Sequence, residues 1–441
     1  MASHWQRGIR VPGTGQQAAA LALALAIVFA LTVSAAEMAQ GQTYNVIHNF
    51  VGGLDGSEPT SGLTLDTAGN LYGTTFEGDA LTGTVYKLAH KSSSWVLSPL
   101  YLFPYEGSGG SIPYARVIFG KDGTLYGTAG YGGNLQNCAG GCGAVFNLRP
   151  QPNPPITPLT PWVETPIHLF NGNDGANPYG ADIIFDPAGN IYGTAYNGGT
   201  GGCTGGCGVV YKLTPSNGSW TESVLYNFAR GSDAQHPWGG VTFDQSGNLY
   251  GTTVFGGANG AGAVYKLTPS GSGWTETVIY SFTGGTDGGN PYAGLIFDQT
   301  GNLYGAAASD GATNGGTVFE LTPSGSSWAF NLLYSFVGAS GQFAQGPVAN
   351  LAFDSAGNLY GTTHGAGTYI YGSVFKLTPG SGGWTYTSLH DFTGGTDGGY
   401  PRSNIVFDKN GNMYGTAAEG GTGNTGNCYG SCGVIFEITP N

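Results

Sequence analysis

Aspartates and aromatic residues recur together in one kind of loop, and this combination suits the recognition of sugars. The clearest copy of the loop, residues 284–291, reads G-G-T-D-G-G-N-P. Aromatic rings stack on the apolar faces of sugars, and carboxylates accept hydrogen bonds from sugar hydroxyls. The alternative is structural, with Asp and Gly forming a turn while Pro and Tyr pack between neighbouring repeats. The candidate ligand-binding residues are Asp55, Asp174, Asp233, Asp287, Asp397, Tyr114, Tyr179, Trp238, Tyr292 and Tyr400.

Six cysteines form three C-x-x-x-C pairs, each within a Gly-rich segment. A zinc site would need further Cys or His ligands converging on a pair, and the seven His do not cluster with them. We therefore predict a disulfide within each pair and no metal. Disulfides persist in oxidising compartments, so the pairs also favour an exported protein. The pairs are Cys138/Cys142, Cys203/Cys207 and Cys428/Cys432.

Catalytic signatures are absent from the sequence. It contains no G-x-S-x-G, H-E-x-x-H or phosphate-loop motif, and nothing in it implies a cofactor. His48, His168 and His390 share one repeat position at which other repeats have Tyr, which indicates packing. A pair of carboxylates at the spacing used by glycosidases stays open on the Asp-bearing loops. Acidic residues outnumber basic ones 26 to 13, which excludes the basic face that nucleic-acid binding requires.

The elements that position these loops belong to a tandem repeat. The string G-N-L-Y-G-T recurs seven times with small changes, and each copy contains four short segments rich in β-branched and aromatic residues. Four antiparallel strands per repeat are typical of a propeller blade. The sequence thus predicts an all-β, seven-bladed β-propeller. The string begins at Gly69, Gly123, Gly189, Gly247, Gly301, Gly357 and Gly411.

The two ends of the chain are complementary halves of one repeat. The chain enters the repeats with a fourth-strand segment, residues 43–50, and its last repeat stops after the third strand, residues 433–438. We expect these segments to pair and close the ring, because an unpaired strand edge is a liability. Residues 42–441 would then form a single propeller domain.

The loops of the repeat differ in character between the two faces. In a propeller, the loop before the first strand and the loop between the second and third strands share one face. The second of these loops is longest in the three repeats that carry Cys pairs, which fall on one arc of the closed ring. Loops tolerate insertions and carry binding residues, so we expect the interaction surface on this face.

The string F-D-x-x-G-N-L-Y-G-T resembles the GloVer-type tandem repeats of exported bacterial "choice-of-anchor" proteins. Residues 69–75 and 357–363 are the clearest copies, and the resemblance covers the chain beyond its N-terminal segment. The resemblance implies a propeller-like repeat fold and no assigned activity. Members of the family often have a C-terminal surface anchor. This chain departs from that pattern, since it ends at Asn441 directly after the last repeat, which favours release or retention in the periplasm over surface attachment.

The N-terminus reads as a signal peptide. Arg7 and Arg10 precede an apolar run from residue 18 to 33, followed by the small-residue cleavage pattern Ser34-Ala35-Ala36. We predict a signal peptide over residues 1–36, with cleavage as late as residue 41, and a secreted or periplasmic monomer free of the membrane. Its function is predicted as non-catalytic binding of a glycan or a cell-envelope protein. A carbohydrate-active hydrolase or lyase, and an extracellular structural scaffold, are the alternatives.

Overall fold

The computed structural model describes residues 42–440 with several internal gaps. The predicted signal peptide lies outside the described residues. The gaps are residues 79–81, 93, 105–108, 152–160, 272, 339–344, 424–427 and 429–430.

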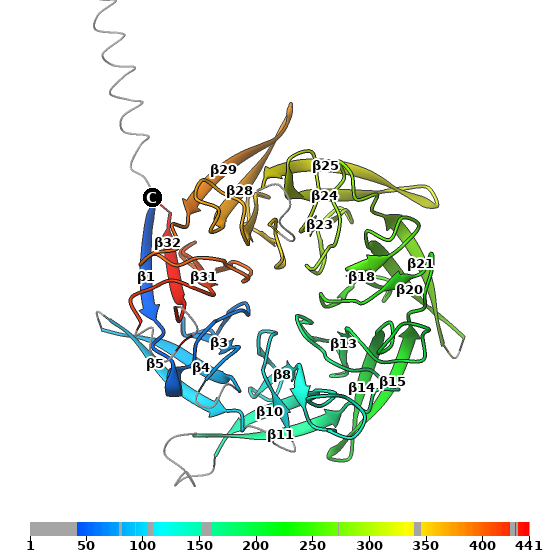
Figure 1. The fold of residues 1–441 in the computed structure, drawn as a ribbon, viewed down its shortest axis with the longest axis horizontal. Helices are drawn as coiled ribbons and strands as arrows, with labels where there is room; N and C mark the ends of the chain where they lie inside the picture. Colours follow the sequence, from blue (N-terminus) through cyan, green and yellow to red (C-terminus); the bar gives the residue numbers. More distant parts are fainter. Residues whose placement is uncertain are drawn as a thin grey trace, which may run out of the picture. The chain divides into compact units, whose positions relative to one another are not determined.

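The described chain forms seven four-stranded sheets arranged as blades around a central axis (Figure 1), which confirms the predicted β-propeller. Blade 1 contains β2 (Thr64–Leu65), β3 (Leu71–Thr75), β4 (Thr84–Lys91) and β5 (Ser94–Leu102). These strands pair in chain order and antiparallel, with β2 innermost and β5 outermost. Blades 2 to 6 repeat this order.

The remaining elements follow the same plan. Blade 2 contains β7 (Ile118–Phe119), β8 (Leu125–Ala129), β10 (Ala144–Pro150) and β11 (Trp162–Leu169). Blade 3 contains β12 (Ile184–Phe185), β13 (Ile191–Ala195), β14 (Val209–Ser216) and β15 (Ser219–Asn227). Blade 4 contains β17 (Thr242–Phe243), β18 (Leu249–Thr253), β20 (Ala263–Ser270) and β21 (Gly273–Ser281). Blade 5 contains β22 (Ile296–Phe297), β23 (Leu303–Ala307), β24 (Asn314–Ser324) and β25 (Ser327–Val337). Blade 6 contains β26 (Ala352–Phe353), β27 (Leu359–Thr363), β28 (Ser373–Gly380) and β29 (Gly383–Asp391). Blade 7 contains β30 (Val406–Phe407), β31 (Met413–Ala417), β32 (Val434–Thr439) and β1 (Thr43–Asn49). Two small ribbons in the loops, β6 (Gly110–Ser111) with β9 (Tyr131–Gly132) and β16 (Ala234–Gln235) with β19 (Phe255–Gly256), and the short 3-10 helix η1 (Gly53–Asp55) complete the described elements.

The ring closes through the two ends of the chain, as the sequence predicted. In Figure 1, β1 (blue) lies beside β32 (red), and the two are hydrogen-bonded neighbours in the sheet of blade 7. The Phe50 N–H donates to the Gly433 carbonyl at 3.1 Å, and the Phe50 side chain is fully buried. Contacts assign residues 44–438 to one compact unit, which holds all seven blades.

Glycine in the repeated L-Y-G-T string makes room for an aromatic ring on the third strand. A Cβ on Gly73, Gly193 or Gly251 would lie 2.3–2.4 Å from the hydroxyl of a buried tyrosine on the neighbouring strand. The hydrophobic cores then form between blades: Val210 and Phe228 of blade 3 pack with Tyr265 of blade 4. Since each blade completes the core of the next, the stability of a blade depends on its neighbours.

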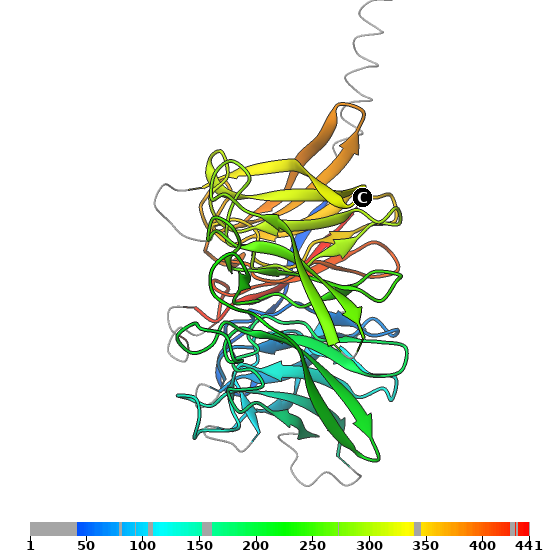
Figure 2. The same ribbon diagram turned by 90° about the vertical axis from the view of Figure 1, so that its right-hand side faces the viewer.

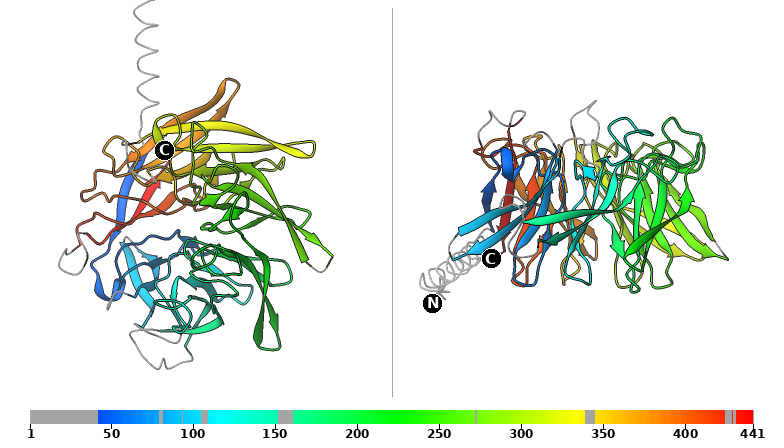
Figure 3. Two further views of the ribbon diagram at one scale, coloured as in Figure 1. Left: turned by 45° about the vertical axis from the view of Figure 1, so that its right-hand side comes forward. Right: turned by 90° about the horizontal axis from the view of Figure 1, so that it is seen from below.

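The two faces of the propeller are built from different loops. Figure 2 and the right-hand view of Figure 3 show the molecule from the side, with loops on one face and the ends of the outer hairpins toward the other. The turn between the first two strands of blade 1 is held by Asp66, whose carboxylate accepts the Asn70 N–H at 2.8 Å and the Asn70 side-chain amide at 2.7 Å. The described part of the chain has no helix both long and apolar enough to cross a membrane.

Candidate functional site

Each of the five loop aspartates is held within its own loop. Asp287 accepts hydrogen bonds from the Thr283 N–H at 2.9 Å and from the Tyr280 hydroxyl at 2.8 Å. Asp397 accepts the Thr393 N–H at 2.9 Å, and its carboxylate lies 3.1 Å from Nε2 of His390. The carboxylates therefore organise the loops, and the structure does not bring them together.

The other three loop aspartates have equivalent partners. Each accepts a backbone N–H of its own loop: Asp55 that of Val51 at 3.1 Å, Asp174 that of Asn171 at 2.8 Å, and Asp233 that of Ala229 at 2.7 Å. Each also faces the His or Tyr of the fourth strand that precedes its loop: His48 at 3.4 Å, His168 at 3.3 Å and Tyr226 at 3.3 Å. The repeated His/Tyr position is thus the partner of the loop aspartate, a link that the sequence analysis missed.

A cavity of about 360 Å³ lies on the axis of the propeller, and residues from all seven blades line it. We call this cavity the cup. Apart from His364, its walls come from the segment that leads from the loop face into each innermost strand. The residue after the loop proline occupies one level in six blades. These residues are Thr60, Tyr114, Trp238, Tyr292, Val348 and Arg402.

Three of the predicted aromatic residues form one wall of the cup. The ring centroid of Trp238 lies 5.3 Å from that of Tyr292 and 6.3 Å from that of Tyr114. Trp238 can enter the cup because Gly180 has no side chain: a Cβ there would lie 2.2 Å from the indole nitrogen. The three side chains are half-buried and line the cavity. The wall therefore presents ring surface to a ligand on the axis.

Tyr179 and Tyr400 take other places. Blade 3 has one extra residue after its loop proline, and Tyr179 packs behind the wall, 5.1 Å from Trp238, with its hydroxyl 2.8 Å from that of Tyr131. Tyr400 precedes its loop proline and lies beside the cup, 5.1 Å from the His364 ring. Arg402, which the sequence analysis did not single out, occupies the cup position in blade 7.

A second level of polar residues forms the floor of the cup. These residues stand two positions before each innermost strand, and the chain enters the propeller there, so they lie deeper than the aromatic wall. Nε of Arg116 lies 2.7 Å from Oδ2 of Asp182, and the Asn350 amide donates to the same oxygen at 3.3 Å. Because Asp182 and Asn350 belong to blades 3 and 6, this network crosses the axis.

Glycines at the same repeat position leave the space that the floor occupies. A Cβ on Gly62 would lie 1.7 Å from Oδ1 of Asn404, and one on Gly294 would lie 3.0 Å from Oδ1 of Asn350. The Gly294 N–H also donates to Oδ1 of Asn350 at 2.6 Å. Some blades thus contribute a large polar side chain to the floor, and others have a glycine that leaves room for it.

The environment of the cup keeps the hydroxyl groups of its tyrosines in the neutral form. Burial raises the pKa of Tyr292 to about 12, and the positive charge of Arg402 opposes this rise. Burial likewise raises the pKa of Tyr114 far above its usual range. Both hydroxyls therefore remain protonated and able to donate hydrogen bonds. Burial lowers the pKa of His236, behind the wall, so this ring stays neutral.

The structure confirms all three predicted disulfides, and each supports a loop of the next blade. The bonded pairs are Cys138–Cys142, Cys203–Cys207 and Cys428–Cys432. The carbonyl of the second cysteine in each pair accepts the N–H of the residue before the next loop proline. Those N–H groups belong to Asn177 at 2.7 Å, His236 at 2.8 Å and Glu58 at 3.0 Å. All three residues have a positive φ, a strained conformation that tertiary contacts must hold.

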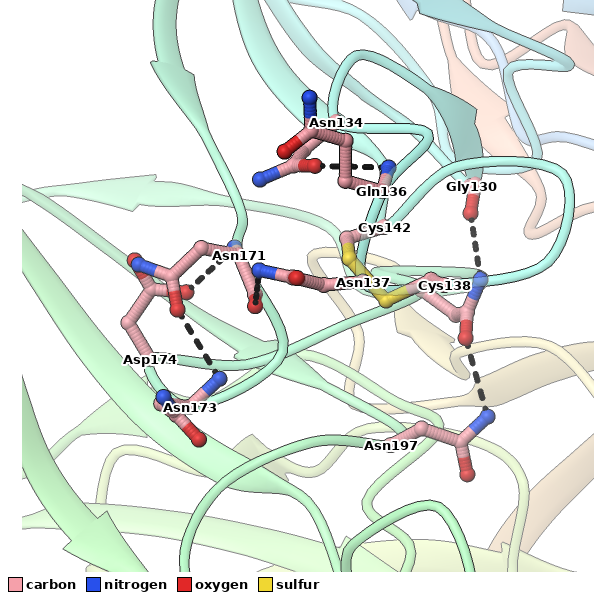
Figure 4. Close-up of a disulfide and its surroundings, with 11 residues drawn as sticks. Gly130, Asn134, Gln136, Asn137, Cys138, Cys142, Asn171, Asn173, Asp174 and Asn197 are labelled. Carbon is pink, nitrogen blue, oxygen red and sulfur yellow. Dashed lines mark hydrogen bonds between the residues drawn. A yellow bond between two sulfur atoms is a disulfide. The ribbon is translucent and has the colours of Figure 1, made fainter.

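Figure 4 shows the blade 2 disulfide, Cys138–Cys142, beside the loop that contains Asn171 and Asp174. The Asn137 amide beside it donates to the Asn171 carbonyl at 2.8 Å, in the loop that Asp174 organises. The Cys pairs and loop aspartates therefore stiffen one connected layer around the cup. In the described residues, no three His, Cys, Asp or Glu side chains form a group that could hold a metal.

The sequence analysis did not identify the floor residues or Arg402, because none of them belongs to a recognisable motif. Their signal was a departure from the repeat: Arg, Asp and Asn stand at a position where other blades have Gly. Aligning the seven segments before the innermost strand would have shown it. These floor residues are Arg116, Asp182, Asn350 and Asn404.

The sequence of this repeat ring matches the Gloeobacter/Verrucomicrobia repeat over residues 24–205 and 200–429. The chain belongs to this family. No curated protein matches it in sequence. In this Gloeobacter/Verrucomicrobia repeat protein, the axial cup is the cavity to which all seven blades contribute residues.

Solved structures resemble the repeat protein in fold at low identity. A candidate oxidoreductase (glucose dehydrogenase) from Thermus thermophilus is 14% identical with a TM-score of 0.40, covering 90% of this chain and 100% of that one. A candidate 6-phosphogluconolactonase from Bacteroides uniformis is 15% identical with a TM-score of 0.47, covering 75% and 84%. Another from Bacteroides fragilis is 13% identical with a TM-score of 0.48, covering 86% and 88%.

Proposed function

We propose that this protein is a secreted, non-catalytic propeller that binds a glycan in its axial cup. The observation that carries the proposal is the combination, in one cavity, of an aromatic wall with a polar, hydrogen-bonded floor. Tyr114, Trp238 and Tyr292 supply ring surface, and Arg116, Asp182 and Asn350 supply donors and acceptors. Sugars present both an apolar face and a rim of hydroxyls, so they match this division.

The size and rigidity of the cup support the proposal. Small-molecule sites commonly have volumes of about 300–1,000 Å³, and the cup falls in this range at about 360 Å³. Its floor is held by an ion pair and amide bonds, and its surrounding loops by disulfides. A site that is ordered before binding loses less conformational entropy when the ligand enters.

The test is a glycan array with the mature protein, followed by titration calorimetry of the best array ligand against wild type and Trp238→Ala. We expect Trp238→Ala to weaken binding by about tenfold or more, since one stacked ring contributes on the order of 1.4 kcal/mol. The control is Phe255→Ala, a half-exposed ring on the same face that does not line the cup. A blank array, or equal losses in both variants, would refute the proposal.

The enzymatic alternative is tested in the same samples. A hydrolase or lyase would release smaller sugars from the array ligand, which chromatography of the incubated mixture detects. The loop aspartates give this alternative little support, because the carboxylate of each accepts a backbone N–H of its own loop. Turnover that survives Trp238→Ala but not Asp287→Asn would replace the binding proposal with the enzymatic one.

Export of the protein belongs to the proposal. The three disulfides fit an oxidising compartment, outside the cell or in the periplasm. Fractionation of the native host with an antibody against the propeller tests it; a purely cytoplasmic protein would contradict export. If the ligand is instead a cell-envelope protein, a pull-down should capture that protein equally well with the wild type and with Trp238→Ala.

A further inference from the structure

A smaller cavity of about 140 Å³ opens beside the cup at the junction of blades 7 and 1. It shares four lining residues with the cup, so the two spaces adjoin. We call it the acidic pocket, after the glutamates Glu58 and Glu419 that line it. The shared residues are Thr60, Tyr114, His364 and Arg402.

The carboxylates of this region are held at fixed backbone positions. Glu77 exchanges two backbone hydrogen bonds with Ser57, at 2.9 and 3.2 Å, and Glu419 exchanges two with Gly399, at 2.9 and 3.0 Å. Glu58 has a positive φ of 52°, and its N–H donates to the carbonyl of the disulfide-bonded Cys432 at 3.0 Å. These backbone contacts thus place three glutamates at the junction of blades 7 and 1.

The repeat shows that this junction is specialised. Glu77 and Glu419 stand eight residues after the first Gly of the repeated string. The other blades have uncharged residues there, and Glu58 likewise replaces uncharged residues or His at the position before the loop proline. The charge therefore comes from departures from the repeat at two neighbouring blades. The uncharged residues at the first position are Tyr131, Asn197, Phe255, Ser309 and Gly365.

The charge balance of the pocket is negative. The charged groups that act on Glu58 are Glu77, Glu419 and Arg402, so three carboxyl groups face one guanidinium; His364 and Tyr400 also line the space. Burial, followed by repulsion from Glu77 and Glu419, raises the pKa of Glu58 to about 7, and Arg402 opposes the rise. An added positive charge would relieve this repulsion.

The walls of the pocket also suit a cation. The rings of Phe76 and Tyr114 pack at 4.8 Å between centroids and both line the space, and aromatic faces attract cations. At its boundary with the cup, the Thr60 hydroxyl oxygen is buried and has no hydrogen-bond partner among the described residues. A rotation of the Thr60 side chain about χ1 would bring this hydroxyl to the pocket, where it could accept a hydrogen bond from an ammonium group.

We infer that the acidic pocket binds the ammonium group of an amino sugar whose ring lies in the cup, against the aromatic wall. This inference rests on the proposed function and narrows its ligand class from glycans in general to sugars with a free amine. Glu58, Glu77 and Glu419 supply the negative charge, and Arg402 lines both the pocket and the cup. An N-acetylated sugar, which lacks the charge, would gain nothing from the pocket.

The test uses matched pairs of sugars in calorimetry with the mature protein at pH 6.5. The probes are glucosamine, galactosamine and mannosamine, each with its parent hexose and its N-acetyl form. We expect at least one amino sugar to bind about tenfold or more tightly than both partners, as one charge pair in a semi-enclosed site contributes about that factor. Glu58→Gln and Glu419→Gln should remove the preference and leave hexose binding unchanged.

Two further readouts separate charge recognition from a structural role. Since part of Glu58 is protonated at pH 6.5, amino-sugar binding should release protons, which calorimetry in buffers of different ionisation enthalpy measures. The control variant is Glu276→Gln, a glutamate with a similarly raised pKa of about 7 on the outer strand of blade 4. It should change neither the preference nor the proton release.

The outcomes distinguish this inference from the proposed function. Equal binding of amino sugars and parent hexoses, weakened by Trp238→Ala but not by Glu58→Gln, overturns the acidic pocket and leaves the cup. Amino-sugar binding that needs Glu58 but not Trp238 overturns the cup as the binding site. The absence of binding by every probe overturns the inference; a positive glycan array with larger neutral ligands would then still support the cup.

Discussion

At the scale of residues, the cup depends on two positions after each loop proline. The first carries rings in blades 2, 4 and 5, and the deeper one carries Arg116, Asp182, Asn350 and Asn404. At Gly62 and Gly294, which occupy the deeper position in blades 1 and 5, the side chains of Asn404 and Asn350 from the neighbouring blades fill the space. The same few positions therefore line the cup and pack against the neighbouring blade. A substitution at one of them should change the packing of that neighbour.

A pH-dependent effect on stability is expected from Glu276 in β21. Burial, followed by repulsion from Asp233, raises the pKa of Glu276 to about 7, and one of its carboxyl oxygens is buried with no hydrogen-bond partner among the described residues. The folded state therefore binds a proton that the unfolded chain releases near pH 4.5. Stability contributed by this group is present at low pH and is lost as the pH rises to about 7.

Glu276→Gln should remove this loss. We expect it to raise the free energy of unfolding at pH 8 by about 1 kcal/mol, after allowance for solvent screening of a half-buried group, and to leave it unchanged at pH 4.5. Urea unfolding at the two pH values measures this difference. An equal change at both pH values would assign the effect to packing instead of ionisation.

At the scale of elements, the disulfide-tipped loops position the neighbouring blade. The Cys207 carbonyl bonds the N–H of His236, two residues before Trp238 in the cup, while the Cys142 carbonyl bonds Asn177, two residues before Tyr179 behind the wall. The short covalent loops contribute only modestly to global stability, so their main effect is local. They hold the residues that directly precede the loop prolines and that have a positive φ.

Removal of the Cys203–Cys207 disulfide should therefore lower ligand affinity more than removal of the Cys138–Cys142 disulfide. Cys203→Ala with Cys207→Ala should weaken binding of the array ligand by about threefold or more, because Trp238 loses its support. Cys138→Ala with Cys142→Ala is the matched control, since it removes an equal loop at a cost of about 2 kcal/mol or less but supports Tyr179. Calorimetry and thermal unfolding of both variants provide the comparison; equal affinity losses would contradict it.

At the scale of the whole molecule, the ring depends on a strand that comes from the opposite end of the chain. Phe50 packs in the core shared by blades 7 and 1, together with Leu71, Tyr86 and Ile435. The cup takes residues from every blade, so its geometry requires a closed ring. The acidic pocket lies at this closing junction and should be the first site lost when the ring opens.

Deletion of residues 42–50 should destabilise the propeller strongly. Loss of the buried Phe50 ring alone costs about 3–5 kcal/mol, and the edge of β32 loses its hydrogen-bonded neighbour. Thermal unfolding of the truncated and the complete mature chains measures the loss. A synthetic peptide of residues 42–50 should restore stability when added in excess, whereas a scrambled peptide should not. Equal stability of the two chains would refute closure by β1.

The sequence determined the fold of this protein because the repeat is local and regular. Seven copies of one string, four strand-like segments in each and complementary ends leave a closed seven-bladed ring as the consistent arrangement. The C-x-x-x-C pairs predicted their disulfides for a similar reason: two cysteines four residues apart in a Gly-rich loop are already neighbours. The same patterns placed Tyr114, Trp238 and Tyr292 on one face.

Only the tertiary structure decided which residues meet on the axis. Asp182 and Asn350 are 168 residues apart and share a hydrogen bond because the ring brings opposite blades together. Arg402 lines the cup and the loop aspartates do not, because the residue after the loop proline faces the axis as the chain enters each innermost strand. A repeat specifies its own blade, but the contents of the central cavity depend on how seven different copies combine.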